Sequence, residues 1–154
     1  MEHTPVLLDE CIGGLNINTD GIYVDGTLGR GGHSREIAKR LKTGKLVAID
    51  RDAAAVEEAK EQLFEFRDKI EFVQGNFSDI REILNVPGYT KISGMLFDLG
   101  VSSPQLDEGA RGFSYMKDAA LDMRMDTQRG ETAFDAVNYW QEEKLRKVFY
   151  EYGE

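Results

Sequence analysis

The chain has 154 residues, the length of one domain with its own hydrophobic core. One cysteine and two histidines exclude an internal disulfide and a zinc site with four Cys/His ligands. The net charge of −9 argues against binding nucleic acid through bulk positive charge, and no apolar run is long enough for a membrane span. We therefore expect a cytoplasmic globular domain without a metal or membrane contact, whose contacts with nucleic acid are local.

Residues 1–100 alternate short apolar runs with helical patterns, which predicts βαβ units and a parallel sheet. We expect four strands, at residues 22–24, 46–49, 70–73 and 95–97. Their nearly continuous apolar character indicates strands that are covered on both faces. No fifth strand is predicted, so the fourth would form an edge of the sheet.

Helices are predicted between these strands, because apolar residues recur there at spacings of three and four. Ser34 is expected to cap the first helix and Asp52 the second. The third would open at Ser78 or Asp79 and end before Pro87.

The pattern changes after residue 101, where serine, proline and glycine predict an irregular segment up to Gly112. Amphipathic helices are expected after it, with Gly153 as the C-cap. Nothing later in the chain covers their apolar face, so we expect self-association as a homodimer or a larger species. The apolar residues concerned are Phe134, Val137, Trp140, Leu145, Val148, Phe149 and Tyr152.

A glycine-rich segment, DGTLGRGGHS at residues 25–34, follows the first strand. Open parallel sheets bind ligands at the carboxyl ends of their strands, and glycines let the backbone approach a ligand there. The segment departs from both phosphate-binding patterns: Ser34 stands in place of the third glycine of the dinucleotide fingerprint, and His33 in place of the P-loop lysine. A tight turn without a ligand is the alternative interpretation.

Further polar or aromatic groups follow the other strands. Asp50 ends the second strand and could accept both hydroxyls of a ribose, or it could be a charge at a helix N-terminus. Phe77 follows the third strand, where it could face an adenine or pack in the core. Residues 98–107 bring two carboxylates and the amide of Gln105 after the fourth strand. Carboxylates at the strand ends, without a phosphate-binding loop, suit S-adenosylmethionine. This ligand has a ribose, a positively charged sulfonium and amino group, and no phosphate.

Four segments closely resemble the bacterial 16S ribosomal RNA cytosine-N4 methyltransferases: residues 3–8 (HTPVLL), 25–34, 97–107 (FDLGVSSPQLD) and 111–115 (RGFSY). The resemblance implies S-adenosylmethionine as the cofactor and one cytosine of 16S ribosomal RNA, in the small ribosomal subunit, as the target. The residues that it places in contact with S-adenosylmethionine are Gly31, Gly32, His33, Asp50, Phe77, Asp98 and Gln105.

The resemblance also implies the architecture, an α/β fold with the Rossmann-like sheet of class I methyltransferases, here represented by its first four parallel strands. Residues 1–110 would form the domain that binds S-adenosylmethionine, and residues 111–154 the start of a helical substrate-recognition insert, incomplete in this chain. Family members are about twice as long as this chain, which looks truncated. We therefore expect cofactor binding more securely than turnover.

Methyl transfer to the cytosine N4 is an in-line displacement at a methyl group activated by the sulfonium, so the protein mainly orients the reactants. Asp98 or Asp107 could hold the amino group and take its proton, and we favour Asp98. Phe113 and Tyr115 are candidates to stack on the base.

Other interpretations stay open at this point. The chain could be a non-catalytic module that binds S-adenosylmethionine or another adenosine ligand. A nicotinamide-dependent dehydrogenase is a weaker alternative, because the third glycine of the dinucleotide fingerprint is missing. Residues 30–45 carry a surplus of positive charge that could guide phosphates or form an ordinary solvated helix face.

Overall fold

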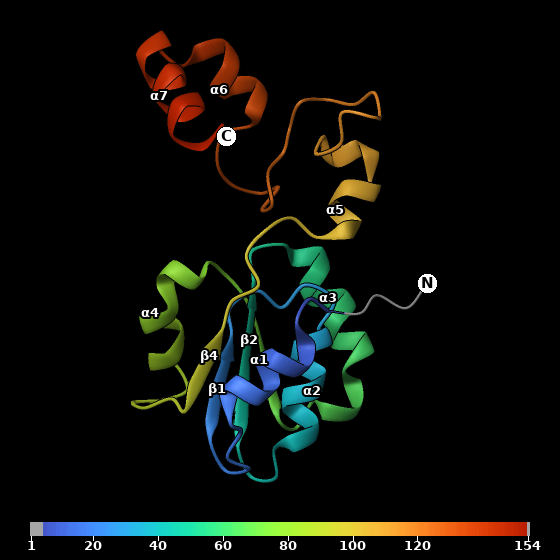
Figure 1. Cartoon of the computed structure of the whole chain (residues 1–154), viewed down its shortest axis with the longest axis vertical. Coiled ribbons are helices and arrows are strands. Elements are labelled where there is room, and N and C mark those ends of the chain that lie inside the picture. Colours follow the sequence, from blue (N-terminus) through green and yellow to red (C-terminus); the bar gives the residue numbers. More distant parts are fainter. Residues whose placement is uncertain (1–4, 154) are drawn as a thin grey trace. The chain divides into compact units, whose positions relative to one another are not determined.

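The computed structural model describes residues 5–153 and divides the chain into two compact units, Met1–Gly100 and Val101–Glu154 (Figure 1). Within the described residues, the first unit contains a four-stranded sheet in which every pairing is parallel. The predicted α/β fold with four parallel strands is confirmed. In spatial order the strands are β3 (Ile70–Gln74), β2 (Lys45–Asp50), β1 (Ile22–Asp25) and β4 (Gly94–Leu96).

The strand order reverses once, and this reversal decides which face each helix covers. The chain steps from β1 to β2 to β3 and then returns past β1 to β4. Because parallel crossovers are right-handed, the helices of the first two steps lie on one face of the sheet and the helix of the return lies on the other. The switch point, where such sheets bind ligands, lies between β1 and β4. The three crossover helices are α2 (Gly32–Arg40), α3 (Ala53–Gln62) and α4 (Ile80–Asn85) (Figure 1).

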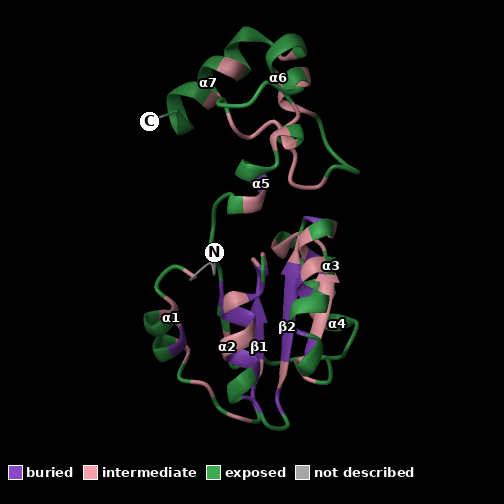
Figure 2. Cartoon of the chain, turned by 90° about the vertical axis from the view of Figure 1, so that its right-hand side faces the viewer, coloured by how far each residue is buried: buried purple, intermediate pink, exposed green. Residues whose placement is uncertain are grey.

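The core is formed by strand residues that alternate between the two faces. Tyr23 and Leu46 belong to the cluster that packs under α2 and α3, whereas their neighbours Val24 and Val47 belong to the cluster on the α4 side. All four are buried, and Figure 2 shows β1 and β2 as the most buried part of the sheet. This explains why the sequence of these strands is apolar without alternation.

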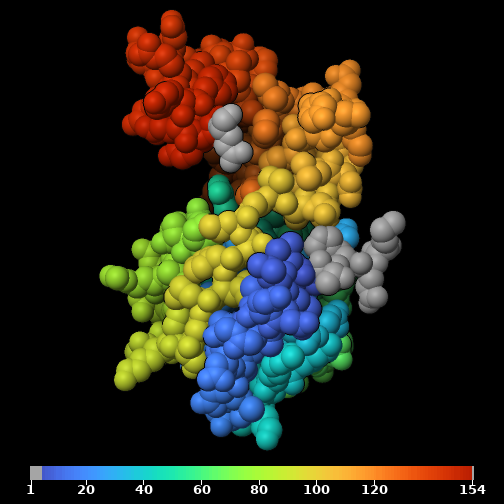
Figure 3. Space-filling model, viewed as in Figure 1, coloured from blue at the N-terminus to red at the C-terminus, as the bar shows by residue number. Residues whose placement is uncertain are grey.

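Helix α1 (Leu8–Leu15) was not predicted from the sequence. Its two adjacent glycines, Gly13 and Gly14, weaken the helical signal because glycine has a low helix propensity. Tertiary packing compensates: Ile12 is buried in the same cluster as Ile37 of α2. Helices α1 and α2 lie side by side at the surface of the first unit (Figure 3).

Several local predictions are corrected. Helix α2 begins two residues before Ser34, and Gly31 in the left-handed conformation occupies its N-cap. Phe97 lies outside β4. Helix α4 opens at Asp79, as predicted, although that side chain makes no capping bond. The side chain that does cap is Asn76, which accepts the N–H of Ser78 at the start of the 3-10 turn η2 (Phe77–Asp79).

Asp52 caps α3 as predicted, since its carboxylate accepts the N–H of Ala54. The remaining short turn of the first unit is the 3-10 helix η1 (Phe64–Phe66), which follows α3.

The second unit contains short helices, with one long connection between η3 and α6. The segment predicted to be irregular in fact forms α5, because Ser102 and Gln105 make a capping box around a proline in the first turn. Two helices follow as predicted, and Gly153 is the C-cap of the last. No helix within residues 5–153 is long and apolar enough to cross a membrane. The elements are α5 (Ser103–Asp107), the 3-10 turn η3 (Gly109–Arg111), α6 (Ala133–Tyr139) and α7 (Glu142–Tyr152).

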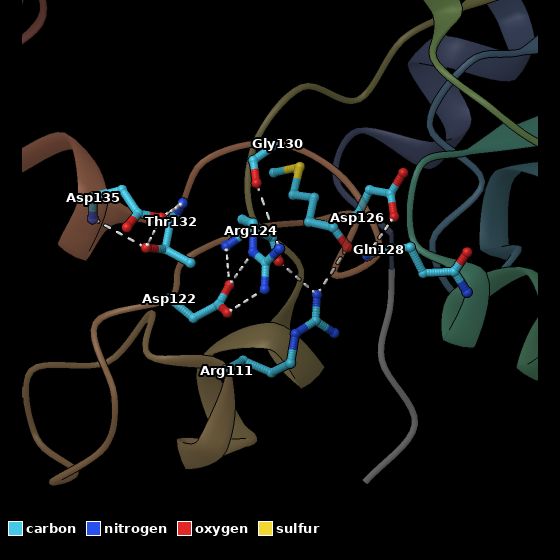
Figure 4. Close-up of polar contacts among 9 residues, drawn as sticks. Arg111, Asp122, Arg124, Asp126, Gln128, Gly130, Thr132 and Asp135 are labelled. Carbon is cyan, nitrogen blue, oxygen red and sulfur yellow. Dashed lines mark hydrogen bonds and ion pairs between the residues drawn. The ribbon is translucent and has the colours of Figure 1, made fainter.

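Polar contacts hold the long connection between η3 and α6 (Figure 4). The Arg124 guanidinium donates two hydrogen bonds to the Asp122 carboxylate, at 2.9 and 2.7 Å. Arg111 donates to the backbone carbonyls of Arg124 and Met125, both at 3.0 Å. The hydrogen bonds from Arg124 hold the pKa of Asp122 below its usual range. These side-chain hydrogen bonds hold a segment that has no helix or strand of its own.

Candidate functional site

The carboxyl end of β1 carries a buried carboxylate, Asp25, which is 1% exposed. It accepts the backbone N–H of Thr27 at 3.1 Å and the hydroxyl of Ser34 at 2.7 Å. Burial raises the pKa of Asp25, and both hydrogen bonds act against that rise by stabilising the ionised form. Asp25 therefore ties the glycine-rich segment to the start of α2.

Asp50 lies at the end of β2, next to the same segment. Its Oδ2 accepts the N–H of Gly29 at 2.8 Å, and its Oδ1 accepts the N–H of Asp52 at 2.9 Å. Asp50 thus has two donors inside the protein, one of them the N–H of Asp52 just before α3. An ionised carboxylate offers about four acceptor positions, so both oxygens retain capacity for a ligand's hydroxyls. Gly29, with φ 49°, has the left-handed backbone that directs its N–H to Asp50.

The three residues predicted at the start of α2 have contacts inside the protein. Gly31 has φ 75°, and a Cβ there would lie 2.6 Å from a methyl group of the buried Leu63. A Cβ on Gly32 would collide with Pro5. The buried ring of His33 donates from Nε2 to the carbonyl of Val6 at 3.1 Å, since a carbonyl can only accept.

These contacts bring part of the segment 3–8 onto the glycine-rich segment, although the two lie far apart in the sequence. His3 and Thr4, which contributed to the resemblance, lie outside the described residues.

The carboxyl end of β4 meets that of β1. The N–H of Gly26 donates to the carbonyl of Leu96 at 2.9 Å, and the Phe97 ring occupies the space that a Cβ on Gly26 would need. Phe97 packs edge-to-face on Phe77, with 5.3 Å between ring centroids, and Phe97 itself is 40% exposed, so this pair lies at the surface rather than in the core. The amide of the exposed Asp98 donates to the Thr27 hydroxyl at 2.6 Å.

Gln105 and Asp107 belong to the second unit. Gln105 is buried, and its Oε1 accepts the N–H of Ser102 at 3.0 Å. Asp107 ends α5 with an exposed side chain, and its backbone carbonyl accepts from Lys117. Phe113 is half-buried beneath the Arg111 guanidinium, whereas Tyr115 is 96% exposed.

The positive charge of residues 30–45 is largely paired. Arg30 lies 3.4 Å from Glu58, Arg35 lies 3.0 Å from Glu65, and Glu36 holds the two cations that follow it on α2. Exposed pairs of this kind contribute little stability, but they reduce the local positive potential. The prediction that this segment could guide phosphates loses its basis, and a solvated helix face describes it better.

Thr27 was missed in the sequence, and Asp25 was included there only as the first residue of the glycine-rich segment. Asp25 stands at a strand end, as Asp50 and Asp98 do, and that position was the available signal. No local pattern indicates the contact from Asp98 to Thr27, because 71 residues separate them. Among the described residues, no group of three or more His, Cys, Asp or Glu side chains could hold a metal ion.

A family of known proteins matches the full length of the chain. The model of the MraW methylase family matches residues 1–154. Ribosomal RNA small subunit methyltransferase H of Brevibacillus brevis is 52% identical over 153 residues, which are 99% of this chain and 49% of that protein. The protein of the same name from Clostridioides difficile is also 52% identical, over the same shares of the two chains. This chain thus spans about half the length of the curated relatives it matches.

Solved structures show the same fold at low identity. A Streptococcus mutans protein in complex with SAH superposes with a TM-score of 0.53 at 20% identity, over 67% of this chain and 56% of that one. A SAM-dependent O-methyltransferase of Thermotoga maritima gives a TM-score of 0.52 at 13% identity, over 64% and 37% of the two chains. The Rossmann-like fold predicted from the resemblance is confirmed. By the match along its whole length, this chain belongs to the MraW methylase family.

Proposed function

We propose that this chain carries the S-adenosylmethionine-binding part of an enzyme that methylates the N4 amino group of a cytosine in 16S ribosomal RNA, in the small ribosomal subunit. One observation carries the proposal: the glycine-rich segment, Asp50 and Asp98 converge at the carboxyl ends of three adjacent strands. The parallel register aligns Asp25 of β1 with Ala48 of β2 and Leu96 of β4, so these ends lie at one edge of the sheet. Ligands of open α/β sheets bind at that edge, beside the switch point.

The chemistry of these groups suits S-adenosylmethionine. Asp50 keeps acceptor capacity for the ribose hydroxyls, and its bond to Gly29 holds the glycine-rich backbone beside it. The exposed carboxylate of Asp98 could bind the positively charged amino group of the cofactor, or it could accept a hydrogen bond from the amino group of the cytosine. No lysine stands in the segment to neutralise a phosphate. When bound, the cofactor supplies a methyl group already activated by its sulfonium, so orientation is the task left to the protein.

The roles of individual residues are part of the proposal. Cofactor contacts are assigned to Gly31, Gly32, His33, Asp50, Phe77, Asp98 and Gln105. Asp98, with Asp107 as the second candidate, takes the proton released from N4. Tyr115, with its ring free of the core, is the better candidate than Phe113 to stack on an unstacked base. Cofactor binding is assigned to residues 1–110 and substrate recognition to 111–154.

Titration calorimetry tests the first step of the proposal. The chain should bind S-adenosylmethionine and its demethylated product, SAH, and should not bind NAD. Asp50→Ala should weaken binding roughly 10- to 150-fold, because hydrogen bonds to a charged group are lost. Asp68→Ala, which removes an exposed carboxylate before β3, is the matched control and should bind normally. Preferential binding of NAD would reject the assignment.

Methylation of small ribosomal subunits tests the second step. This chain alone should give no more methyl label than its Asp98→Asn variant. When the half that its relatives carry in addition is joined to it, nucleoside analysis by mass spectrometry after incubation with the cofactor should detect N4-methylcytidine, and Asp98→Asn should lower its amount. A methyl group on another base or atom would support methyltransferase activity but reject the N4 amino group of cytosine as its target. Binding of S-adenosylmethionine without any methylation by the longer protein would favour a non-catalytic binding module.

A further inference from the structure

The chain leaves the sheet at the end of β4 and there depends on one side chain of the glycine-rich segment. The last ladder contact is the bond from Gly26 N–H to the Leu96 carbonyl, at 2.9 Å. Two residues later, the Asp98 amide donates to the Thr27 hydroxyl at 2.6 Å. The backbone of Asp98 is therefore held across the switch point by a side chain of the neighbouring strand end, while its carboxylate stays exposed.

The backbone of Thr27 is in turn fixed by Asp25. Its N–H donates to the buried Asp25 carboxylate at 3.1 Å, and the hydroxyl of Ser34 donates to the other oxygen of that carboxylate at 2.7 Å. A β-branched side chain such as threonine has few χ1 rotamers, so a fixed backbone also fixes the hydroxyl. The contacts form a continuous path from α2 through Asp25 and Thr27 to Asp98.

We propose that Thr27 is a positioning residue for Asp98, anchored by Asp25. The inference rests on the proposed function, since it concerns the carboxylate assigned there to the cofactor and the N4 proton. A displacement of about 1 Å in a reacting group can cost on the order of a hundredfold in rate, so a single hydrogen bond that fixes the Asp98 backbone affects the site. Thr27 acts through Asp98 and contacts no reactant.

Substitutions of Thr27 separate the hydroxyl from the shape of the side chain. Thr27→Val removes the acceptor at nearly constant volume and should weaken S-adenosylmethionine binding roughly threefold to tenfold. Thr27→Ser restores the hydroxyl and should restore the affinity. Thr43→Val is the matched control. It removes a threonine hydroxyl that donates to Asp20, near the amino ends of β1 and β2 and thus away from the site, and it should leave the affinity unchanged.

A double-mutant cycle with Asp98→Asn distinguishes positioning from general loosening of the fold. If Thr27 acts through Asp98, Thr27→Val should have less effect on affinity in the Asp98→Asn background than in the unmodified chain. Additive losses of affinity would overturn the proposal. So would failure of Thr27→Ser to restore binding.

Amide hydrogen exchange tests the contact without any cofactor, so it separates this inference from the proposed function. The Asp98 amide should be protected in the unmodified chain and in Thr27→Ser, and should exchange about tenfold faster in Thr27→Val. Equal exchange in all three chains would overturn the inference even if S-adenosylmethionine binds. Protection that depends on Thr27, in a chain that does not bind the cofactor, would support the contact and reject only the proposed function.

Discussion

The carboxylate of Asp25 shows how one residue organises the site. It is buried at the end of β1 and has two donors, the hydroxyl of Ser34 and the N–H of Thr27. A buried carboxylate costs free energy unless such donors stabilise it. Here one donor, Thr27, lies near the start of the glycine-rich segment and the other, Ser34, lies at its end. Because both must reach the same carboxylate, Asp25 constrains the path of the backbone between them.

Removing the Ser34 hydroxyl should therefore destabilise the fold. We expect Ser34→Ala to lower the free energy of unfolding by about 1–3 kcal/mol at pH 7, the cost of leaving a buried acceptor without its donor. Urea unfolding should show a lower midpoint with an unchanged m-value. Ser78→Ala, at an exposed serine, should stay within about 0.5 kcal/mol of the unmodified chain.

The loss should also depend on pH, with a sign that follows from the pKa of Asp25. Burial raises this pKa, so the contribution of Asp25 to stability is full below its unfolded pKa and declines as pH rises through the folded value. Without Ser34 the folded pKa rises further, because one stabilising hydrogen bond is gone. The destabilisation by Ser34→Ala should thus be larger at pH 7 than at pH 3. An equal loss at both pH values would contradict the role given to Asp25.

At the scale of elements, the entry to α2 combines a positive φ with close packing. Gly31 has φ 75°, and its missing side chain leaves room for Leu63, which follows α3. The sequence suggested a backbone that approaches a ligand, for which a larger residue would abolish binding and spare stability. The contact with Leu63 adds a packing role for Gly31 at the start of α2, beside the cofactor contact proposed for it.

Gly31→Ala should consequently lower the free energy of unfolding by about 2–4 kcal/mol, from left-handed strain and overpacking against Leu63. Thermal unfolding followed by circular dichroism measures this. The control is Gly14→Ala in α1, where a Cβ meets nothing within 4 Å and alanine should be neutral or stabilising by about 0.5–1 kcal/mol. A Gly31→Ala chain that melts normally but no longer binds cofactor would contradict the packing role and leave only the cofactor contact for Gly31.

For the whole molecule, the carboxylates of the two units change stability in opposite directions as the pH falls. The second unit relies on Asp122, whose pKa the Arg124 side chain lowers, and on Asp135, whose pKa the Thr132 hydroxyl lowers. A carboxylate with a lowered pKa contributes stability above its unfolded pKa and loses it as pH falls through the folded value. Asp25 in the first unit contributes in the opposite direction.

Trp140 can report this difference, because it is the single tryptophan and lies in the second unit. Its ring lies 3.3 Å below Lys144 Nζ, and its N–H donates to Glu131 at 2.8 Å. We expect Trp140 fluorescence to change below about pH 4, before the circular dichroism of the sheet is lost. Asp122→Asn should weaken the second unit at pH 7 and reduce its further response to acid, whereas the exposed Asp118→Asn should not.

Exposed aromatic side chains on α7 predict association between copies of this chain. Phe149 is 66% exposed and Tyr152 is 76% exposed, while Leu145 and Val148 are half-buried. Burying a large apolar side chain contributes roughly 1.5–3 kcal/mol. Sedimentation velocity should show dimers or larger species that become monomers in a Phe149→Ser, Tyr152→Ser chain. A monomer at all concentrations would contradict the prediction.

The sequence by itself determined the elements whose signal is local. Apolar runs defined the four strands, Asp52 marked the start of α3, and Gly153 marked the end of α7. The order of polar residues at the strand ends also predicted the edge of the sheet where the site would lie. The predictions of the strands, of the Asp52 cap and of Gly153 are confirmed, because periodicity and caps depend on neighbours within a few residues, whereas the position of the site stays a prediction.

Only the tertiary structure decided which partners those site residues have. Asp50 accepts the N–H of Gly29, 21 residues away, and Asp98 donates to Thr27 across 71 residues. Gly31 accommodates Leu63, and α1 forms despite its glycines because the core accepts Ile12. The physical reason is the same in each case: burial and hydrogen-bond satisfaction are properties of segments brought together by the fold, and the local pattern around each residue contains no information about its distant partner.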